Sequence, residues 1–103
     1  TGAGSSNTLT GVLAAWMDSI PLLVISGNEP TKFMRRDEYN RVIGVQGYNS
    51  SKVARDITKF AVRITKANEV HEIGMAYQTA LTPRFGPVWV DIPRDVQTMK
   101  AEL

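Results

Sequence analysis

The first 27 residues constrain the fold most, because a glycine-rich turn, an amphipathic helix and an apolar strand follow one another there. The turn is the run Gly2-Ala3-Gly4-Ser5-Ser6-Asn7. Apolar residues then recur every three or four positions, which predicts one apolar helix face made of Leu9, Val12, Leu13, Trp16 and Met17. Pro21 cannot continue the helix, and the apolar run over residues 22–25 is typical of a strand covered on both faces.

The turn is also the first candidate binding element. Ser5, Ser6 and Asn7 are each able to cap the helix, because their side-chain oxygens can accept from the free amides of its first turn. A turn of small residues lets a ligand approach the backbone, and a helix N-terminus attracts anions. Gly2 and Gly4 match the start of a dinucleotide fingerprint, but Asn7 replaces the third glycine, so this match is weak.

Two further elements follow a polar connection over residues 28–40, which we expect to be a surface loop. Residues 42–48 are compatible with a strand, but their two glycines favour an irregular passage. Asn49 or Ser50 is then placed to cap a short helix that runs to Arg55. Residues 58–64 alternate, which predicts a strand with Phe60, Val62 and Ile64 on one side.

The second half of the chain predicts a helix and a strand. The helix ends before Pro83, and its apolar face is formed by Val70, Ile73, Ala76, Tyr77, Ala80 and Leu81. An apolar strand follows over residues 87–93, between two prolines. Helices and strands therefore alternate, which predicts an α/β fold: a three-layer, doubly wound, mainly parallel sheet with helices on both faces. Because three buried strands need more cover than these helices supply, we expect an incomplete domain.

Two polar residues of this half are candidates for chemistry. Asp91 lies near the carboxyl end of the last strand, where α/β sheets present functional groups, but it can also cap a helix or pair with Arg94. His71 lies off the apolar helix face among charged residues, which favours a solvated surface residue over a catalytic one. Without a phosphate loop, a serine elbow or a histidine pair, residue spacing alone defines no catalytic constellation.

Composition narrows the class of protein. At 103 residues with 43% apolar content, the chain can form at most one small domain with a core. Twelve basic and ten acidic residues give a net charge of +2, and the densest charged run, residues 32–38, contains both signs, which argues against a nucleic-acid partner. The absence of cysteine excludes disulfides and cysteine-ligated metals. With no signal peptide and no apolar run near the ~18 residues of a membrane span, we expect a soluble cytoplasmic protein without a membrane partner.

Three stretches carry a family resemblance. They are the glycine turn with Ala-Trp-Met-Asp-Ser-Ile-Pro-Leu-Leu-Val-Ile-Ser-Gly, then Ile-Gly-Val-Gln-Gly-Tyr-Asn-Ser with Asp-Ile-Thr-Lys-Phe-Ala-Val-Arg, and finally Arg-Phe-Gly-Pro-Val-Trp-Val-Asp-Ile-Pro-Arg-Asp-Val-Gln. Together they resemble the N-terminal, pyrimidine-binding domain of the acetolactate synthase family, whose members depend on thiamine diphosphate. The resemblance implies that residues 1–93 are the C-terminal portion of that domain and that residues 94–103 begin a linker to the next one.

The resemblance also implies a set of site residues. Gly2, Ala3 and Gly4 match a Gly-Pro-Gly loop that lies against the pyrimidine ring of the cofactor, with Ala3 in place of proline. Asn7 matches an asparagine near the cofactor. Further along the chain, a Phe-Gln pair that lines the reaction centre corresponds to Tyr48 and Asn49, and Ser50 replaces the glutamate that follows it.

Two arginines complete the matched positions. Arg84 matches an arginine that contacts FAD in flavin-containing members, and Arg94 matches a lysine near the substrate entrance. Ala3, Tyr48, Asn49 and Ser50 depart from the family pattern in the pocket, which leaves the acceptor substrate open.

The family resemblance further implies a catalytic residue and a cofactor-binding domain that this chain lacks. The catalytic glutamate lies upstream of the glycine loop, and a C-terminal domain holds the diphosphate and its magnesium. We therefore expect this chain to be inactive alone and to contain no metal site. The parent enzyme would decarboxylate a 2-oxo acid such as pyruvate and transfer the two-carbon unit, with active sites between two subunits. Another thiamine-diphosphate decarboxylase, a keto-sugar carboligase and a non-catalytic α/β binding module remain alternatives.

Overall fold

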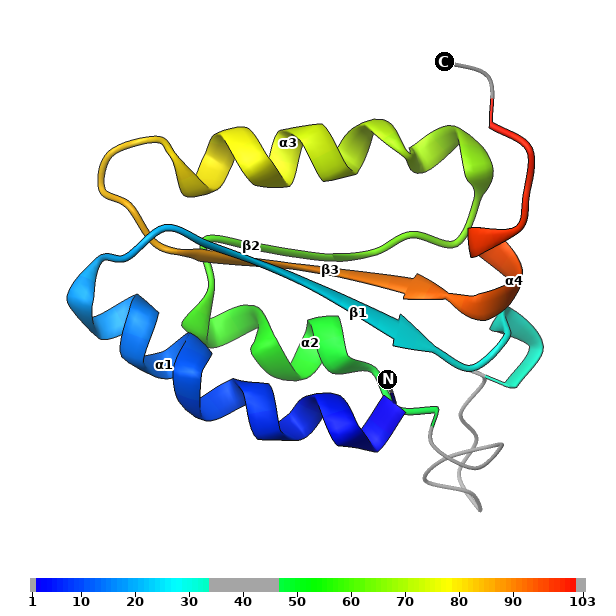
Figure 1. The fold of residues 1–103 in the computed structure, drawn as a ribbon, viewed down its shortest axis with the longest axis horizontal. Helices are drawn as coiled ribbons and strands as arrows, with labels where there is room; N and C mark the ends of the chain where they lie inside the picture. Colours follow the sequence, from blue (N-terminus) through cyan, green and yellow to red (C-terminus); the bar gives the residue numbers. More distant parts are fainter. Residues whose placement is uncertain (1, 34–46, 102–103) are drawn as a thin grey trace.

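The computed structural model describes residues 2–33 and 47–101, in which one parallel sheet is flanked by helices on both faces (Figure 1). The strands lie in the order β1-β3-β2, with the bounds β1 (Leu22–Asn28), β2 (Phe60–Arg63) and β3 (Pro87–Pro93). The α-helices are α1 (Leu9–Asp18), α2 (Ser50–Ala54), α3 (His71–Ala80) and α4 (Arg94–Gln97). Short 3₁₀ helices cover Gly2–Thr8, Thr31–Phe33, Arg55–Ile57 and Ala67–Glu69. This architecture confirms the predicted three-layer α/β class.

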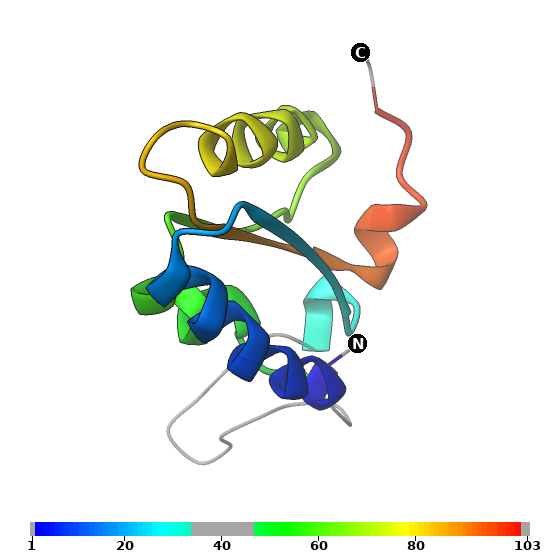
Figure 2. The same ribbon diagram turned by 60° about the vertical axis from the view of Figure 1, so that its left-hand side comes forward.

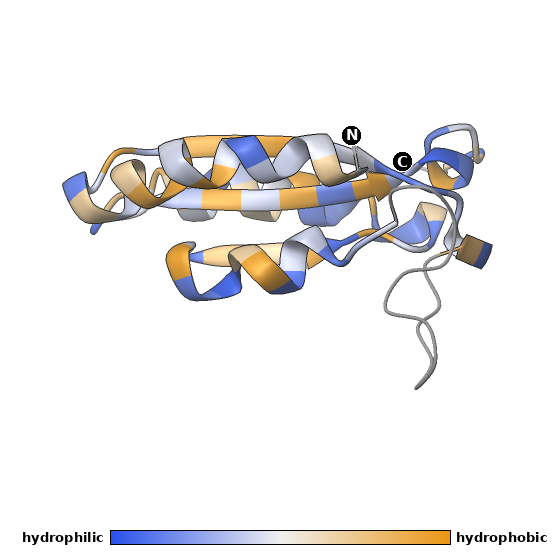
Figure 3. Cartoon of the chain, turned by 90° about the horizontal axis from the view of Figure 1, so that it is seen from below, coloured by the Kyte–Doolittle hydropathy of each residue, from blue (hydrophilic) through white to orange (hydrophobic). Residues whose placement is uncertain are grey.

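Strand β3 is the centre of the fold, because it pairs with β1 on one side and β2 on the other. Its side chains alternate between two cores, as the period of a strand requires. Val88 and Val90 pack with Ala76 and Ala80 of α3 on one face. On the other face, Trp89 packs against α1 and α2, in a cluster with Val12 and Ala54. In the rotated view of Figure 2, α3 lies on one side of the sheet and α1 and α2 lie on the other. Figure 3 shows apolar colour concentrated along the strands.

The start of α1 differs from the prediction. The glycine-rich run forms a 3₁₀ helix, Gly2–Thr8, that leads directly into α1. The N-cap is Thr8, which makes no side-chain capping bond, so the prediction that Ser5, Ser6 or Asn7 caps the helix was wrong. The reason is that Thr8 already has helical backbone angles, φ −74° and ψ −22°, because α1 continues directly from the 3₁₀ helix before it.

The predicted apolar faces are only half covered. On α1, Val12 is buried, but Leu13, Trp16 and Met17 are 43%, 41% and 67% exposed. On α3, Ala76 and Ala80 are buried and Ile73 is packed against the core, whereas Tyr77 and Leu81 are exposed. The strand expected to be covered on both faces has Ile25 exposed by 57%. These exposed positions agree with an incomplete domain.

The remaining elements largely follow the sequence. Asn49 caps α2, because its Oδ1 accepts from the amide of Lys52 at 3.1 Å. Strand β2 has the predicted alternation, because Phe60 and Val62 pack against the core on the α3 side and Ala61 packs against the other core. Helix α3 ends before Pro83. Residues 34–46, which hold most of the predicted connection and most of the ambiguous passage, lie outside the described residues. No helix in the described ranges has both the length and the apolar character needed to cross a membrane.

The tail after β3 is not fully detached from the domain. Residues Arg94–Gln97 form α4, and Val96 packs into the core on the α3 side. The carboxylate of Asp95 accepts hydrogen bonds from the amide of Thr31 at 3.0 Å and from its hydroxyl at 2.6 Å. These bonds lower the pKa of Asp95, with the bond from the Thr31 hydroxyl as the main cause. The boundary at residue 93 stays a prediction.

Candidate functional site

The matched residues lie at two opposite ends of the sheet. All strands are parallel, so their carboxyl ends share one edge, to the right in Figure 1. The segment Gly2–Thr8, Tyr48, Asn49 and Arg94 lie at this carboxyl edge. Arg84 lies before β3, at the other end. Because β3 has seven residues, the two ends are roughly 20 Å apart.

Asp91 is the centre of a buried polar network at the carboxyl edge. Its side chain is fully buried and accepts three hydrogen bonds. The hydroxyl of Ser26 donates to Oδ1 at 2.6 Å, Nδ2 of Asn28 donates to Oδ2 at 2.8 Å, and Nε of Arg63 donates to Oδ2 at 3.1 Å. The alternative in which Asp91 pairs with Arg94 is therefore wrong, because Arg94 is exposed on α4 and Asp91 forms its ion pair with Arg63.

Two of the donors to Asp91, Asn28 and Arg63, also bond to the backbone of Tyr48. Nδ2 of Asn28 and Nη2 of Arg63 each donate to the carbonyl oxygen of Tyr48 at 2.9 Å. The hydroxyl of Tyr48 shares a hydrogen bond of 2.7 Å with the hydroxyl of Ser5. The structure thus joins the glycine-rich segment and the Tyr48–Asn49 segment, which are more than 40 residues apart in the sequence.

Ser26 connects this network to the core of the sheet. Its hydroxyl accepts from the indole Nε1 of Trp89 at 2.9 Å while it donates to Asp91. The hydroxyl of Ser50, at the start of α2, lies 3.4 Å away. Within the described residues, no buried side-chain nitrogen or oxygen lacks a hydrogen-bond partner. The network is therefore complete as a structural unit, as buried polar groups require.

The accessible part of the carboxyl edge is formed by the glycine-rich segment and the start of α2. Ala3, Gly4 and Asn7 are exposed, and a Cβ built on Gly4 would meet nothing within 4 Å. A planar group can therefore approach the backbone there. Tyr48 is half-buried beside this opening, and Asn49 is exposed, with its Oδ1 engaged as the N-cap of α2.

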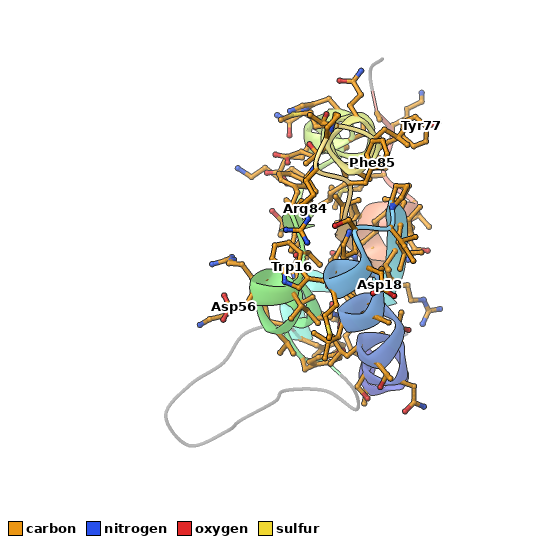
Figure 4. All side chains as sticks on the ribbon, turned by 90° about the vertical axis from the view of Figure 1, so that its left-hand side faces the viewer. Trp16, Asp18, Asp56, Tyr77, Arg84 and Phe85 are labelled. Carbon is orange, nitrogen blue, oxygen red and sulfur yellow. The ribbon has the colours of Figure 1, made fainter. Side chains whose placement is uncertain are left out.

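The opposite end of the sheet carries a cavity. A cavity of about 410 Å³ is lined by Trp16, Met17, Lys59, Arg84 and Phe85. Figure 4 looks onto this end and shows Arg84 close to Trp16. Nε of Arg84 donates to the hydroxyl of Ser19 at 2.5 Å, while Nζ of Lys59 donates to backbone carbonyls at the end of α3. This end therefore combines aromatic surface with an exposed guanidinium.

His71 has the position predicted for it. It is exposed at the start of α3, and its Nδ1 lies 3.1 Å from the carbonyl oxygen of Asn68. Residues 2–33 and 47–101 contain no group of three histidine, aspartate or glutamate side chains able to hold a metal ion.

Sequence reasoning missed three members of the polar network, namely Ser26, Asn28 and Arg63. A signal was present, because Ser26 and Asn28 are two residues apart at the end of a strand and so point to the same face. Their target, Asp91, could not be assigned without the pairing of β1 with β3.

Comparison with known proteins gives the family. No family model matches the chain. Curated relatives include a probable acetolactate synthase large subunit of Methanocaldococcus jannaschii, 34% identical over 93% of this chain and 15% of the relative. The acetolactate synthase isozyme 1 large subunit of Escherichia coli is 33% identical over 99% of this chain and 17% of its own length. The acetolactate synthase large subunit of Lactococcus lactis is 33% identical over 96% of this chain and 16% of its own length.

The chain spans about a sixth of the length of these relatives. Within that sixth the match to the Escherichia coli subunit extends over 103 residues, which is 99% of this chain. The chain therefore belongs to the acetolactate synthase-like family, of whose large subunits it matches one segment.

Proposed function

We propose that this chain is part of the pyrimidine-binding domain of a thiamine-diphosphate enzyme that makes acetolactate from pyruvate. In this proposal the carboxyl edge of the sheet contacts the pyrimidine ring of the cofactor. The observation that carries the proposal is the hydrogen bond between Ser5 and Tyr48, which brings together the two segments matched to the cofactor site. The edge is also where parallel α/β sheets generally bind ligands.

The residues at this edge suit a planar, nitrogen-rich ring. Open space beside Gly4 allows the ring to lie against the backbone, and the exposed amide of Asn7 can donate to or accept from ring nitrogens. The half-buried ring of Tyr48 supplies an apolar wall with a polar tip. When bound, thiamine diphosphate supplies carbanion stabilisation for 2-oxo acid decarboxylation. The protein residues bind the ring, orient it and exclude water.

The rest of the proposed site lies on other segments or subunits. We assign the catalytic glutamate, the diphosphate and its magnesium to parts of the enzyme outside this chain, and the substrate entrance to Arg94. FAD, if the enzyme carries it, would use Arg84 at the opposite end of the sheet. The parent enzyme would be a cytoplasmic homo-oligomer in which a second subunit completes each active site.

Other members of the same enzyme class are the first alternative. The replacement of the family Phe-Gln pair by Tyr48-Asn49 favours this alternative, because it changes size and reach in the pocket. The enzyme would then be another thiamine-diphosphate decarboxylase or a keto-sugar carboligase. The other alternative, a cofactor-free α/β binding module, would leave the exposed edge at Gly4 without a ligand.

The test uses the full-length protein that carries this chain. Calorimetry with magnesium should show thiamine diphosphate binding, and an acetolactate assay should show product formed from pyruvate. Tyr48→Ala should weaken cofactor binding about tenfold, because it removes the ring and its bond to Ser5. Tyr77→Ala is the matched control, since Tyr77 is exposed on α3, which packs on the opposite face of the sheet from α1 and α2, and this variant should bind the cofactor as the unmodified protein does.

Each negative outcome has a distinct meaning. Absence of thiamine diphosphate binding would overturn the proposal and leave the binding module. Binding without acetolactate, but with turnover of another 2-oxo acid or a keto sugar, would support the alternative enzymes. Equal weakening by Tyr48→Ala and Tyr77→Ala would show that Tyr48 does not contact the cofactor.

A further inference from the structure

The geometry points to Asn28, Arg63 and Asp91 as positioning residues for the Tyr48–Asn49 segment. They act on the backbone of Tyr48 and thereby set the place of its side chain at the carboxyl edge. This inference deepens the proposed function and rests on it, because that function places Tyr48 beside the cofactor. None of the three residues touches the cofactor in the proposal, so their effect would be transmitted through Tyr48.

The segment before α2 needs such support. Residues 47–49 have no regular secondary structure, so no sheet ladder or helix fixes their backbone. Instead, the carbonyl oxygen of Tyr48 accepts from Asn28, Arg63 and the amide of Ser50. Asn28 comes from β1 and Arg63 from β2, so two strands that do not pair with each other converge on one carbonyl group.

Asp91 explains why both donors point there. It lies on β3, between the two strands, and directly opposite Arg63 in the register. Oδ2 of Asp91 accepts from Asn28 at 2.8 Å and from Arg63 at 3.1 Å. Each donor therefore has one hydrogen bond that fixes it to β3 and another that fixes Tyr48. The buried carboxylate also neutralises the guanidinium, whose side chain is only 14% exposed.

The arginine geometry matters for this role. Arg63 uses Nε for Asp91 and Nη2 for the Tyr48 carbonyl, which are two nitrogens of one rigid plane. A lysine would keep the charge but offer a single nitrogen for both acceptors. Arg63→Lys should therefore keep the ion pair and loosen Tyr48.

The first measurement needs no cofactor. In the full-length protein without ligand, hydrogen exchange followed by mass spectrometry reports on the peptide that covers residues 47–52. Asn28→Leu has similar volume but no donors, and it should speed exchange in this peptide about tenfold. Val62→Ala is the control, because it weakens the core on β2 without touching Tyr48, and it should leave this peptide unchanged.

The second measurement uses thiamine diphosphate with magnesium. Asn28→Leu should raise the dissociation constant about tenfold, the scale of one lost hydrogen bond, while Val62→Ala should leave it unchanged. For Arg63→Lys, the exchange rate of the peptide over residues 47–52 and the dissociation constant of thiamine diphosphate should both lie between those of Asn28→Leu and of the unmodified protein. Because Arg63→Lys keeps the buried carboxylate paired, it also serves as the test if Asn28→Leu does not fold.

The two measurements separate the two hypotheses. Unchanged exchange at residues 47–52 in both variants would overturn the positioning role, whatever the cofactor does. Faster exchange in a protein that binds no thiamine diphosphate would overturn the proposed function and leave the structural support of Tyr48 in place. Faster exchange with an unchanged dissociation constant would overturn the link between Tyr48 and the cofactor site.

Discussion

The two ends of strand β3 differ in how much of their surroundings is exposed to solvent. The strand ends in a buried polar network and begins beside an exposed apolar surface. At the carboxyl end, Asp91 is fully buried and every one of its hydrogen bonds is made within this chain. At the amino end, Trp16, Met17 and Phe85 are 41%, 67% and 44% exposed around an open cavity. The carboxyl end is structurally self-sufficient, whereas the amino end exposes apolar side chains of the kind that other protein segments or ligands cover.

This difference teaches which end depends on its surroundings. A substitution in the network should act on the chain itself, because it leaves buried partners without hydrogen bonds. A substitution on the apolar surface should act on what the surface meets and little on the fold. Three substitutions test this division, and we give them in decreasing order of predicted effect.

The largest effect is expected for Asp91→Asn. The neutral amide would leave the buried guanidinium of Arg63 without its counter-charge and would offer one acceptor oxygen in place of two. Breaking a buried pair in this way costs about 3–5 kcal/mol, so the opening free energy of β3 should fall by that amount, as measured by hydrogen exchange. Asp56→Asn, on the exposed 3₁₀ helix after α2, should change it by less than about 0.5 kcal/mol. Equal effects of the two would contradict the special status of the carboxyl end.

An intermediate effect is expected for Arg84→Ala, on ligand binding and not on folding. If the enzyme carries FAD at the amino end, loss of the guanidinium should weaken flavin binding by about 1.5–3 kcal/mol, the scale of a charged hydrogen bond. Thiamine diphosphate binding should be unchanged, since the two ends are roughly 20 Å apart. Fluorescence titration of the full-length protein with FAD measures this, and Arg84→Lys should recover only part of the loss.

Arg55→Ala provides the control for this experiment, because Arg55 is also exposed but lies outside the cavity. A full-length protein that neither contains flavin nor gains it on addition of FAD would remove the role of Arg84 altogether. Arg84 would then be a surface residue that only bonds Ser19.

The smallest effect on folding is expected for Met17→Glu. Met17 is 67% exposed on α1, so the opening free energy of β3 should change by less than about 0.5 kcal/mol. Val12→Glu on the same helix is the contrasting variant, because Val12 is fully buried and a buried carboxylate has no partner there. We expect the chain made alone to self-associate through its exposed apolar side chains, and Met17→Glu should reduce this self-association in sedimentation experiments. Unchanged self-association would show that the amino end is not the surface responsible.

The sequence predicted the elements better than it predicted their contacts. Periodicity located α1, α3, β2 and β3, because apolar spacing reflects which side of an element is buried. It overestimated burial at Leu13 and Tyr77, since periodicity reports a face suited to burial, and only neighbouring segments decide whether it is covered. The glycine-rich run predicted a turn over residues 2–7, where the chain forms a 3₁₀ helix, because local preferences are weak against the helix that follows.

The candidate site was predictable only in part. The residues matched by resemblance could be named, and the strand predicted over residues 87–93 already separated Arg84 from Arg94. The contact between the glycine-rich segment and Tyr48 could not be predicted in this way. Pairing with Arg94 was one of the alternatives for Asp91, and it joins residues that are near in the sequence, whereas Arg63 reaches Asp91 through the pairing of β2 with β3. Pairing between strands is a long-range property, and one chain read in order does not contain it.

The buried carboxylate also acts as a check on how β1 and β3 are assembled. Ser26 lies opposite Asp91, and Asn28, two residues on, points to the same side of the sheet. A slip of β1 by one residue would turn both donors to the other face and bring the apolar Ile25 or the bare Gly27 beside the carboxylate. The apolar residues of β1 would tolerate such an error, because Leu22, Leu23, Val24 and Ile25 form an apolar run. Asp91 would not tolerate it, so a single acidic side chain allows the chain to discriminate its correct assembly from neighbouring mistakes during folding.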